Sequence, residues 1–458
     1  MPSLHSKQSA VSRRSFLRYA SLAAAGNAAG LKPFGMLNAL AATGGAADYK
    51  ALVCVFLYGG NDANNTIIPF DTKGYANYAS LRGPLALDQG TLLTLPGLQN
   101  YALHPSLPEI QKLVNSGQAA IVSNVGTLLQ PTTRANYLAG KVSNPSNLFS
   151  HPDQQQEWQN ASASGSVATG WAGRMSDLLG SSYNTAASIP MVTSVAGDTL
   201  FCNGASTTPV AVSPGNLTGA TCSEGSACSA RTAAAQSLVT FNSGLSLVQA
   251  DNGVTANAYK YAKSLADATA SASPLKTVFP TANGLAAQLQ QIAQLIAVRS
   301  ALGVDRQIYF CGIGNFDTHS TQLTTQATLL GQISAAIGAF YQATQELGVA
   351  NQVTTFTMSD FARTMQPNSN GGSDHGWGSH HFVVGGSVLG NKMYGTYPTL
   401  ALGGPDDSGS NGRWIPSTAS VQYASTLAQW FGVSTAQLAQ VFPTLSGFGT
   451  NTKLGFMG

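Results

Sequence analysis

The chain has 458 residues, of which only 9% are charged, and a formal net charge of +3. Residues 1–42 hold five of the 22 lysines and arginines and no acid, so subtracting them leaves 17 bases against 19 acids and a net charge near −2. The rest of the chain therefore has no excess of basic residues for nucleic acid to bind, which argues against that class of protein.

The first 42 residues have the features of a twin-arginine export signal. The segment SRRSFLR at 12–18 is followed by a weakly apolar, Ala-rich run that ends in the small residues ALAA at 39–42. Gly26 and Pro33 interrupt this run, and no other segment is apolar enough to span a bilayer. We expect residues 1–42 to be removed after export by the twin-arginine translocase, with residues 43–458 periplasmic or secreted and not inserted in a membrane.

Apolar runs and apolar periodicity predict alternating strands and helices. The predicted strands cover residues 51–58, 119–123, 307–311 and 353–358. The predicted helices cover residues 107–116, 171–179, 285–302 and 322–347. Strands that alternate with long helices indicate an α/β domain, with a mostly parallel sheet and helices on both faces.

A stretch rich in Ser, Thr, Ala and Gly, at about 202–280, breaks this alternation. It is either an insertion that caps one edge of the sheet or a partly disordered surface segment. Three of the five cysteines, Cys202, Cys222 and Cys228, lie in it. An oxidising compartment would allow one disulfide among them, with the pairing left open. Cys54 and Cys311 lie in apolar runs and are expected to be buried thiols.

Acids and histidines follow the predicted strands where each strand ends. Asp62 follows the first strand, and Asp317 and His319 follow the third. Asp374 and His375 lie in a loop beyond the fourth. Ligands bind at the carboxyl ends of the strands in such sheets, so these side chains are expected to converge. Carboxylate and imidazole groups together favour a divalent metal site, and a hydrogen-bonded structural network is the alternative.

Several motifs together resemble the bacterial domain of unknown function 1501 family. They are YGGNDANNTIIP at 58–69, SDFART at 359–364, GGSDHG at 371–376 with Asn368 before it, and KMYG at 392–395. The resemblance covers about residues 50–431. That family is exported by the twin-arginine route and is related to the alkaline phosphatase and sulfatase superfamily. The resemblance therefore implies an alkaline phosphatase-like core and a hydrolase with one or two divalent ions. The sequence does not distinguish among Zn, Mn, Mg and Ca as the metal.

The resemblance also implies roles for individual residues. One ion would be held by Asp62 with the pair Asp374 and His375. The other would be held by Asp317 and His319 with His380 or His381. Adjacent residues of an extended segment point to opposite sides, so only one of the tandem histidines can face the ion.

A hydroxyl nucleophile and two anion contacts complete the expected site. The segment FSH at 149–151 resembles the family's Ser-His-Phe segment, which makes Ser150 the candidate nucleophile. Pro152 replaces the usual aromatic residue, and the alternative is that Ser150 is a loop serine bonded to the backbone. Asn65 and Arg363 are the candidate contacts to a substrate anion.

Two functions remain open on the sequence. The first is an exported, metal-dependent hydrolase of phosphate or sulfate esters, acting on a small-molecule or polysaccharide ester. The second is a non-catalytic envelope protein that is stabilised by metal and binds a partner or polysaccharide through residues 202–280. The incomplete nucleophile motif favours the second function, while the set of acids and histidines favours the first.

Overall fold

The computed structural model describes residues 48–162, 167–215, 226–241, 244–270 and 272–458. Lys50–Gly458 forms one unit, which is described here by itself. The predicted export signal at 1–42 lies outside the described residues. Among the helices that are described, none combines the length and the apolar character needed to cross a membrane.

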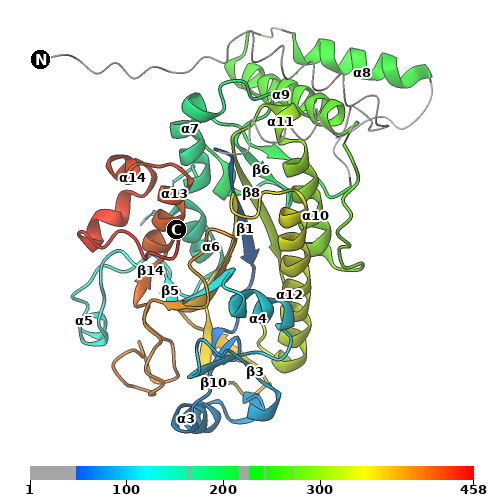
Figure 1. The fold of residues 1–458 in the computed structure, drawn as a ribbon. Helices are drawn as coiled ribbons and strands as arrows, with labels where there is room; N and C mark the ends of the chain where they lie inside the picture. Colours follow the sequence, from blue (N-terminus) through cyan, green and yellow to red (C-terminus); the bar gives the residue numbers. More distant parts are fainter. Residues whose placement is uncertain (1–47, 163–166, 216–225, 242–243, 271) are drawn as a thin grey trace, which may run out of the picture. The chain divides into compact units, whose positions relative to one another are not determined.

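The centre of the fold is a nine-stranded, mostly parallel sheet (Figure 1). Its order is β13-β5-β12-β9-β1-β8-β6-β7, and β14 also pairs with β5. In this sheet β12 runs antiparallel to both of its neighbours, and the other described pairings are parallel. The strands are β1 (Lys50–Leu57), β5 (Ala119–Gly126), β6 (Val192–Ser194), β7 (Val210–Ala211), β8 (Arg306–Ile313), β9 (Val353–Ser359), β12 (Ser379–Val384), β13 (Met393–Tyr394) and β14 (Thr418–Ala419).

All four predicted strands are confirmed, as β1, β5, β8 and β9. The β1 run is apolar throughout, whereas the other three include polar residues such as Ser123, Gln307 and Thr354, and nearly every residue of these strands is buried. A parallel strand covered on both faces needs apolar side chains on both sides, so continuous runs rather than alternating ones mark the middle of this sheet. The predicted α/β class with a mostly parallel sheet is therefore confirmed.

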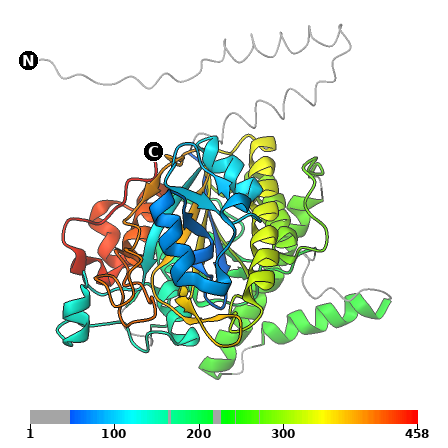
Figure 2. The same ribbon diagram turned by 90° about the horizontal axis from the view of Figure 1, so that it is seen from below.

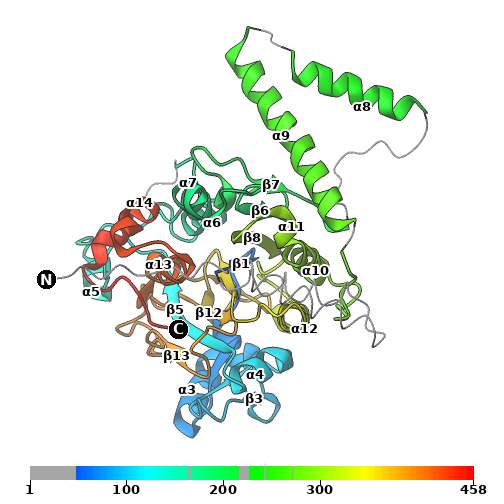
Figure 3. The ribbon, with the colours of Figure 1, turned by 45° about the horizontal axis from the view of Figure 1, so that its top comes forward.

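Helices cover both faces of the sheet, as Figures 1 and 3 show. One face carries α4, α10 and α12, and the other carries α6, α7 and α13. Figure 2 shows the same separation from below, with the yellow α12 on one side and the red C-terminal helices on the other. The helices are α4 (Pro108–Asn115), α6 (His151–Asn160), α7 (Trp171–Tyr183), α10 (Gly284–Ala297), α11 (Arg299–Leu302), α12 (Gln322–Glu346), α13 (Ser420–Phe431) and α14 (Leu438–Val441).

A hydrophobic core lies between the sheet and helices α7 and α13. Leu52, Cys54 and Phe56 of β1 project into it and meet Trp171 of α7 and Leu427 of α13, all of them buried. Alternate residues of a strand point to opposite faces, so the residues between them pack on the other side of the sheet. The central strands are thus held from both faces.

Smaller elements surround the sheet. Two further sheets are present, one of β10 and β11 and one in the order β2-β4-β3. The remaining described elements are β2 (Ile67–Pro69), β3 (Leu93–Thr94), β4 (Tyr101–Leu103), β10 (Arg363–Pro367), β11 (Ser373–His375), α3 (Thr72–Arg82), α5 (Arg134–Leu138) and short 3₁₀ turns such as Ala63–Asn65. The hairpin of β10 and β11 follows β9 and carries part of the candidate site.

The described part of 202–280 is largely helical. It contains α8 (Ser226–Val239) and α9 (Ser246–Thr269), and β7 extends the edge of the main sheet. Cys54, Cys202 and Cys311 are free and buried, as expected for Cys54 and Cys311, while Cys228 is disulfide-bonded. Cys202 therefore takes no part in the disulfide that the cysteine cluster predicts.

Candidate metal centre

The candidate site forms where the central parallel strands end. Asp360 directly follows β9, and Asp317 lies in the loop after β8. The turn after β1 passes between these segments, and Gly59 donates its N–H to Asp360 Oδ1 at 3.2 Å. Gly59 has a φ of +111°, and a Cβ there would collide with the backbone of Asp317. Glycine at this position lets the turn after β1 approach the β8 loop closely.

Three imidazole rings reach this edge from different elements. His151 is the first residue of α6, His319 lies just before α12, and His375 is the last residue of β11. In the antiparallel β10–β11 pair His375 lies opposite Arg363, which places both side chains near the β8 loop. The convergence predicted for Asp317, His319, Asp374 and His375 is therefore present in the structure.

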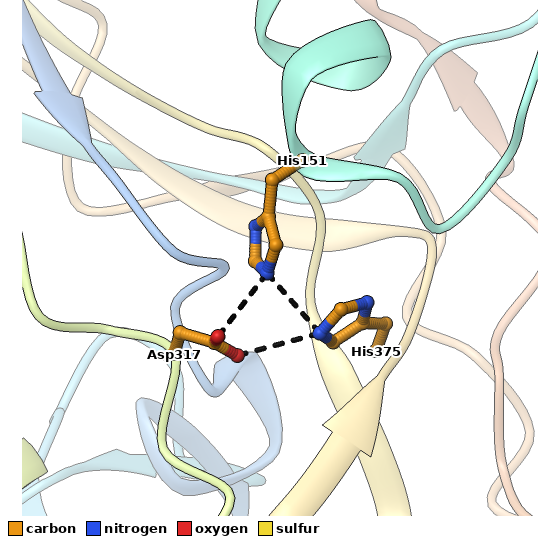
Figure 4. A group of neighbouring side chains, drawn as sticks. All are labelled: His151, Asp317 and His375. Atoms are coloured by element: carbon orange, nitrogen blue, oxygen red, sulfur yellow. Dashed lines mark hydrogen bonds and ion pairs between the residues drawn. The ribbon is translucent and has the colours of Figure 1, made fainter.

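The Nε2 atoms of His151 and His375 lie beside the Asp317 carboxylate (Figure 4). His151 Nε2 and His375 Nε2 lie 3.1 Å apart, and they lie 3.4 Å from Asp317 Oδ2 and 3.3 Å from Asp317 Oδ1 respectively. His319 Nε2 joins from the other side, 3.0 Å from both His375 Nε2 and Asp317 Oδ1. We call His151, Asp317, His319 and His375 the His₃Asp cluster.

The second nitrogen of each ring faces an acceptor. His375 Nδ1 lies 2.7 Å from the carbonyl oxygen of Phe149, and His151 Nδ1 lies 2.7 Å from Asp360 Oδ2. Because those oxygens can only accept, each Nδ1 carries the ring proton, and Nε2 of the neutral ring presents a lone pair. Lone pairs of His151 and His375 that face each other at 3.1 Å require a shared proton or a metal cation between them.

His319 is held in the same way by the loop that precedes β11. Its Nδ1 lies 3.1 Å from Asp374 Oδ1, and Asn368 Nδ2 donates to the same carboxylate oxygen at 3.3 Å. Partial burial would raise the pKa of Asp374, but the hydrogen bonds from Asn368 and His319 outweigh it and the pKa is lowered. Asp374 thus orients His319 from behind the cluster.

Asp317 is kept ionised by Arg363, whose Nη1 donates to Asp317 Oδ1 at 2.8 Å. Partial burial works against ionisation, but the bond and charge of Arg363 prevail, so the pKa of Asp317 is lowered. Burial lowers the pKa of His375, whereas the bond to Asp360 raises the pKa of His151. The cluster therefore combines a carboxylate with imidazole groups of unequal basicity.

Within the His₃Asp cluster, His151, Asp317 and His375 fit a divalent cation in donor type, spacing and access. Ligands about 2.0–2.1 Å from a tetrahedral zinc ion lie about 3.3 Å from one another. The 3.1–3.4 Å separations among His151, Asp317 and His375 are close to that value. The Asp317 side chain is 45% exposed, so molecules in solution can reach the centre. Among the described residues, His151, Asp317 and His375 form the group whose donor atoms suit an ion.

The assignment of Asp62 as a ligand is corrected by its contacts. Asp62 is buried and its carboxylate forms an ion pair with Arg82, which is also buried. Gln322 donates to the same oxygen, and Asn64 donates its N–H to the other. These three donors engage both oxygens, and Arg82 balances the charge of the carboxylate. Asp62 therefore fixes the turn after β1 and lies outside the cluster.

His380 and His381 also lie outside the cluster, because β12 carries them into the interior. His380 Nδ1 accepts the N–H of Asn124 at 3.0 Å and its ring stacks on Tyr397. His381 Nδ1 lies 3.2 Å from Thr357 Oγ1, and its ring stacks on Tyr423. Burial lowers the pKa of each histidine to about 3. Both are neutral core side chains, which corrects their assignment as ligands.

The two predicted anion contacts are occupied inside the protein. Asn65 is buried, donates to Leu85 O and accepts from Tyr78 and Arg82. Arg363 is fully buried and donates to Asp317, to Gly59 O and to Ser373 O. Both side chains therefore bond within the protein, and the anion-contact assignments are corrected.

Ser150 is adjacent to the cluster in sequence, but its hydroxyl donates to Asp153 Oδ2 at 2.5 Å. No contact between Ser150 Oγ and the His₃Asp cluster is found in the described residues. Its role as nucleophile stays a prediction.

Sequence analysis missed His151 as a member of the cluster, although it stands next to Ser150. The signal is the FSH segment at 149–151, in which His151 directly follows the candidate nucleophile. Asp360 lies in the SDFART motif but is assigned no role in the site from the sequence. In the structure it accepts from His151, Gln155 and the Gly59 N–H, so it orients His151.

A family model described as protein of unknown function (DUF1501) matches residues 49–408. The chain belongs to this family, and the resemblance inferred from its motifs is confirmed. No curated protein matches the chain.

Several solved structures are similar at 10–13% identity. Ps i-CgsB in complex with k-i-k-neocarrahexaose has a TM-score of 0.35, covering 87% of this chain and 77% of that chain. The lipoteichoic acid synthase LtaP from Listeria monocytogenes has a TM-score of 0.34, and the match covers 86% of this chain and 74% of that chain. A mutant of alkaline phosphatase PafA has a TM-score of 0.26, and the match covers 69% of this chain and 63% of that chain. TM-scores this low carry no weight in the functional argument.

Proposed function

We propose that this protein is an exported, metal-dependent hydrolase of phosphate or sulfate esters. The observation that carries the proposal is the convergence of three imidazole Nε2 atoms on Asp317 at a solvent-accessible edge of a parallel sheet. Such edges are where ligands bind in α/β folds. A divalent ion supplies Lewis acidity at a site of this kind.

The donor set favours one group of metals over another. Imidazole nitrogen suits zinc and other first-row transition metals, whereas calcium and magnesium prefer oxygen ligands. The His₃Asp cluster offers three ring nitrogens and one carboxylate, so zinc or manganese is proposed ahead of magnesium or calcium. Each ring has an acceptor behind it, in Asp360, Asp374 and the Phe149 carbonyl, which fixes its orientation for the ion.

Ester hydrolysis also needs a nucleophile and a path for the leaving group. The nucleophile is either water or the Ser150 hydroxyl, which would need to exchange its bond to Asp153 for one to substrate. Export through the twin-arginine signal is part of the proposal and follows from the segment at 12–18.

The proposal is tested by metal analysis and an ester screen on the same purified protein. We expect bound zinc or manganese and turnover of aryl phosphates or aryl sulfates. Asp317→Ala should lose at least about 100-fold in kcat/KM, because a metal centre supplies several kcal/mol to the transition state. Asp267→Asn, at an exposed ion pair with Lys263 on α9, is the matched control. Ser150→Ala distinguishes attack by serine from attack by water.

Bound metal without turnover of any ester would contradict the hydrolase and favour the non-catalytic envelope protein. Equal turnover by the wild type and Asp317→Ala would show that the reaction does not use the cluster.

A further inference from the structure

Arg413 lies beside the His₃Asp cluster with donors that the protein does not use. Its Nε donates to the carbonyl oxygen of His375 at 2.7 Å, and its guanidinium lies 4.5 Å from the ring centroid of Phe149. Within the described part of the chain, neither Nη group has a hydrogen-bond partner. The side chain is only half-buried, so the Nη groups are not sealed in the interior.

The position of Arg413 is built into its loop. Asp407 is fully buried, and its carboxylate accepts the backbone N–H groups of Gly403, Gly409, Gly412 and Arg413 at 2.9–3.1 Å. Ser408 N–H also donates to Arg413 O at 2.9 Å. This arrangement fixes the backbone from which the arginine side chain extends toward His375.

Phe149 links Arg413 to the same imidazole. Its ring lies under the guanidinium while its carbonyl accepts from His375 Nδ1 at 2.7 Å. Phe149 has a φ of +74°, a left-handed conformation that is uncommon for a non-glycine residue. Strain of this kind is kept where the surrounding structure requires it, commonly at functional sites. The left-handed conformation of Phe149 allows its ring to contact Arg413 while its carbonyl oxygen accepts from His375.

The other arginines near the centre each form an ion pair with an aspartate. Arg363 is paired with Asp317 and Arg82 with Asp62, and both arginines are buried. Arg413 has no such ion pair among the described residues. Its guanidinium presents two further nitrogens in a planar fork that matches two oxygens of a phosphate or sulfate group.

We infer that Arg413 binds the tetrahedral oxyanion of the substrate at this centre and selects anionic esters over neutral ones. This inference rests on the proposed function and deepens it. It assigns to Arg413 the anion contact that the sequence assigned to Asn65 and Arg363. Arg413 lies beyond residue 408, where the family match ends.

The test is calorimetric titration of zinc-loaded protein with orthophosphate and, separately, with sulfate. We expect Arg413→Gln to bind both ions about 10- to 100-fold more weakly, since a charge-assisted pair of hydrogen bonds is lost. The affinity of Arg413→Lys for both ions should lie between those of the wild type and Arg413→Gln, because lysine keeps the positive charge but lacks the planar fork of nitrogens. Lys112→Gln, an exposed change of equal charge on α4, should bind like the wild type. Zinc content and melting temperature confirm that each variant is folded and loaded.

Steady-state kinetics give a second readout. Arg413→Gln should raise KM for an aryl phosphate and leave KM for a neutral aryl acetate unchanged. Unaltered ion binding by Arg413→Gln, or no ion binding by the wild type, would overturn the inference whether or not esters are hydrolysed. Arg413-dependent ion binding without any turnover would instead overturn the hydrolase and leave the anion site standing.

Discussion

The three imidazole rings of the His₃Asp cluster are each supported from behind by a different acceptor. Asp360 holds His151, the Phe149 carbonyl holds His375, and Asp374 holds His319. Such outer partners fix the tautomer and the orientation of a metal-binding histidine. Phe149 lies two residues before His151, and Asp374 is next to His375, so the rings and their acceptors form one connected set.

Replacing one histidine inside the cluster and one outside it should separate ligands from core residues. Losing an outer-shell partner costs about 10–100-fold in metal affinity, so His151→Ala, which removes a ligand, should cost more. His380→Phe should keep the metal but lose about 1–3 kcal/mol of stability, because the buried N–H of Asn124 loses its acceptor. Metal titration and urea unfolding of both variants check this. Loss of metal in His380→Phe alone would contradict it.

At the residue scale, the sequence predicted most of the side chains that converge at the site. It wrongly assigned several buried side chains as ligands or anion contacts. Asp317, His319, Asp374 and His375 follow strand ends, which parallel topology brings together. Asp62 also follows a strand. However, its partner Arg82 lies 20 residues away, at the end of α3, and nothing local reveals that pairing. The approach of His151 depends on how α6 packs, which the sequence alone does not determine.

Among the elements, α7 packs closely against the segment that follows the 3₁₀ turn Leu200–Cys202. A Cβ at Gly173 would collide with the backbone of Asn203, whereas a Cβ at Gly180 in the same helix would meet nothing within 4 Å. Gly173→Ala should therefore destabilise the protein, by about 1–3 kcal/mol as in overpacked cores. Gly180→Ala should stabilise it by about 0.5–1 kcal/mol through helix propensity. Equal shifts in urea unfolding would refute this packing account.

Helix α6 carries a buried acid that should make stability depend on pH. Burial of Glu157 raises its pKa to about 8, although Gln154 and the Ser146 N–H donate to it. Between pH 4.5 and 8 the folded protein holds a proton that the unfolded chain has released. This contribution to stability is therefore full below pH 4.5 and is lost as the pH rises to 8.

The Glu157→Gln variant should not lose this contribution to stability as the pH rises, because its side chain does not titrate. One pKa unit corresponds to about 1.4 kcal/mol, so the variant should gain at least about 1 kcal/mol relative to the wild type between pH 5 and pH 8. Urea unfolding at both pH values measures the difference. Glu346 is the control, because N–H groups of Lys276 and Thr277 lower its pKa and its titration lies below this range. Parallel pH profiles for wild type and Glu157→Gln would contradict the argument.

The elements located from the sequence are strands that are buried in the sheet and helices with an apolar periodicity. The strands β1, β5, β8 and β9 appear as short runs rich in apolar and β-branched residues, and α12 as a 25-residue periodic segment. Strand β12 was missed because its Ser379, His380 and His381 look like a polar loop. They are buried all the same, since neighbouring strands and aromatic rings supply partners for both imidazoles.

For the whole molecule, the centre joins segments that are far apart in the chain. The loop after β8, the β10–β11 hairpin and the start of α6 meet at the His₃Asp cluster. A cation that binds only the folded state adds about 2.7 kcal/mol at a free concentration of 100 Kd. Chelation should therefore lower the melting temperature, and added zinc should restore it. Asp317→Ala should not respond to either treatment, and an equal response would locate the stabilising ion elsewhere.

Cys54 on β1 and Cys311 on β8 lie on adjacent central strands, and Cys311 Sγ donates to Cys54 O at 3.2 Å. Burial raises the pKa of both thiols, so the reactive thiolate form is scarce. Alkylating reagents in solution can modify these sulfurs only when the two strands separate. The rate of their modification therefore reports how often the middle of the sheet opens, and the protein carries its own probe of global unfolding.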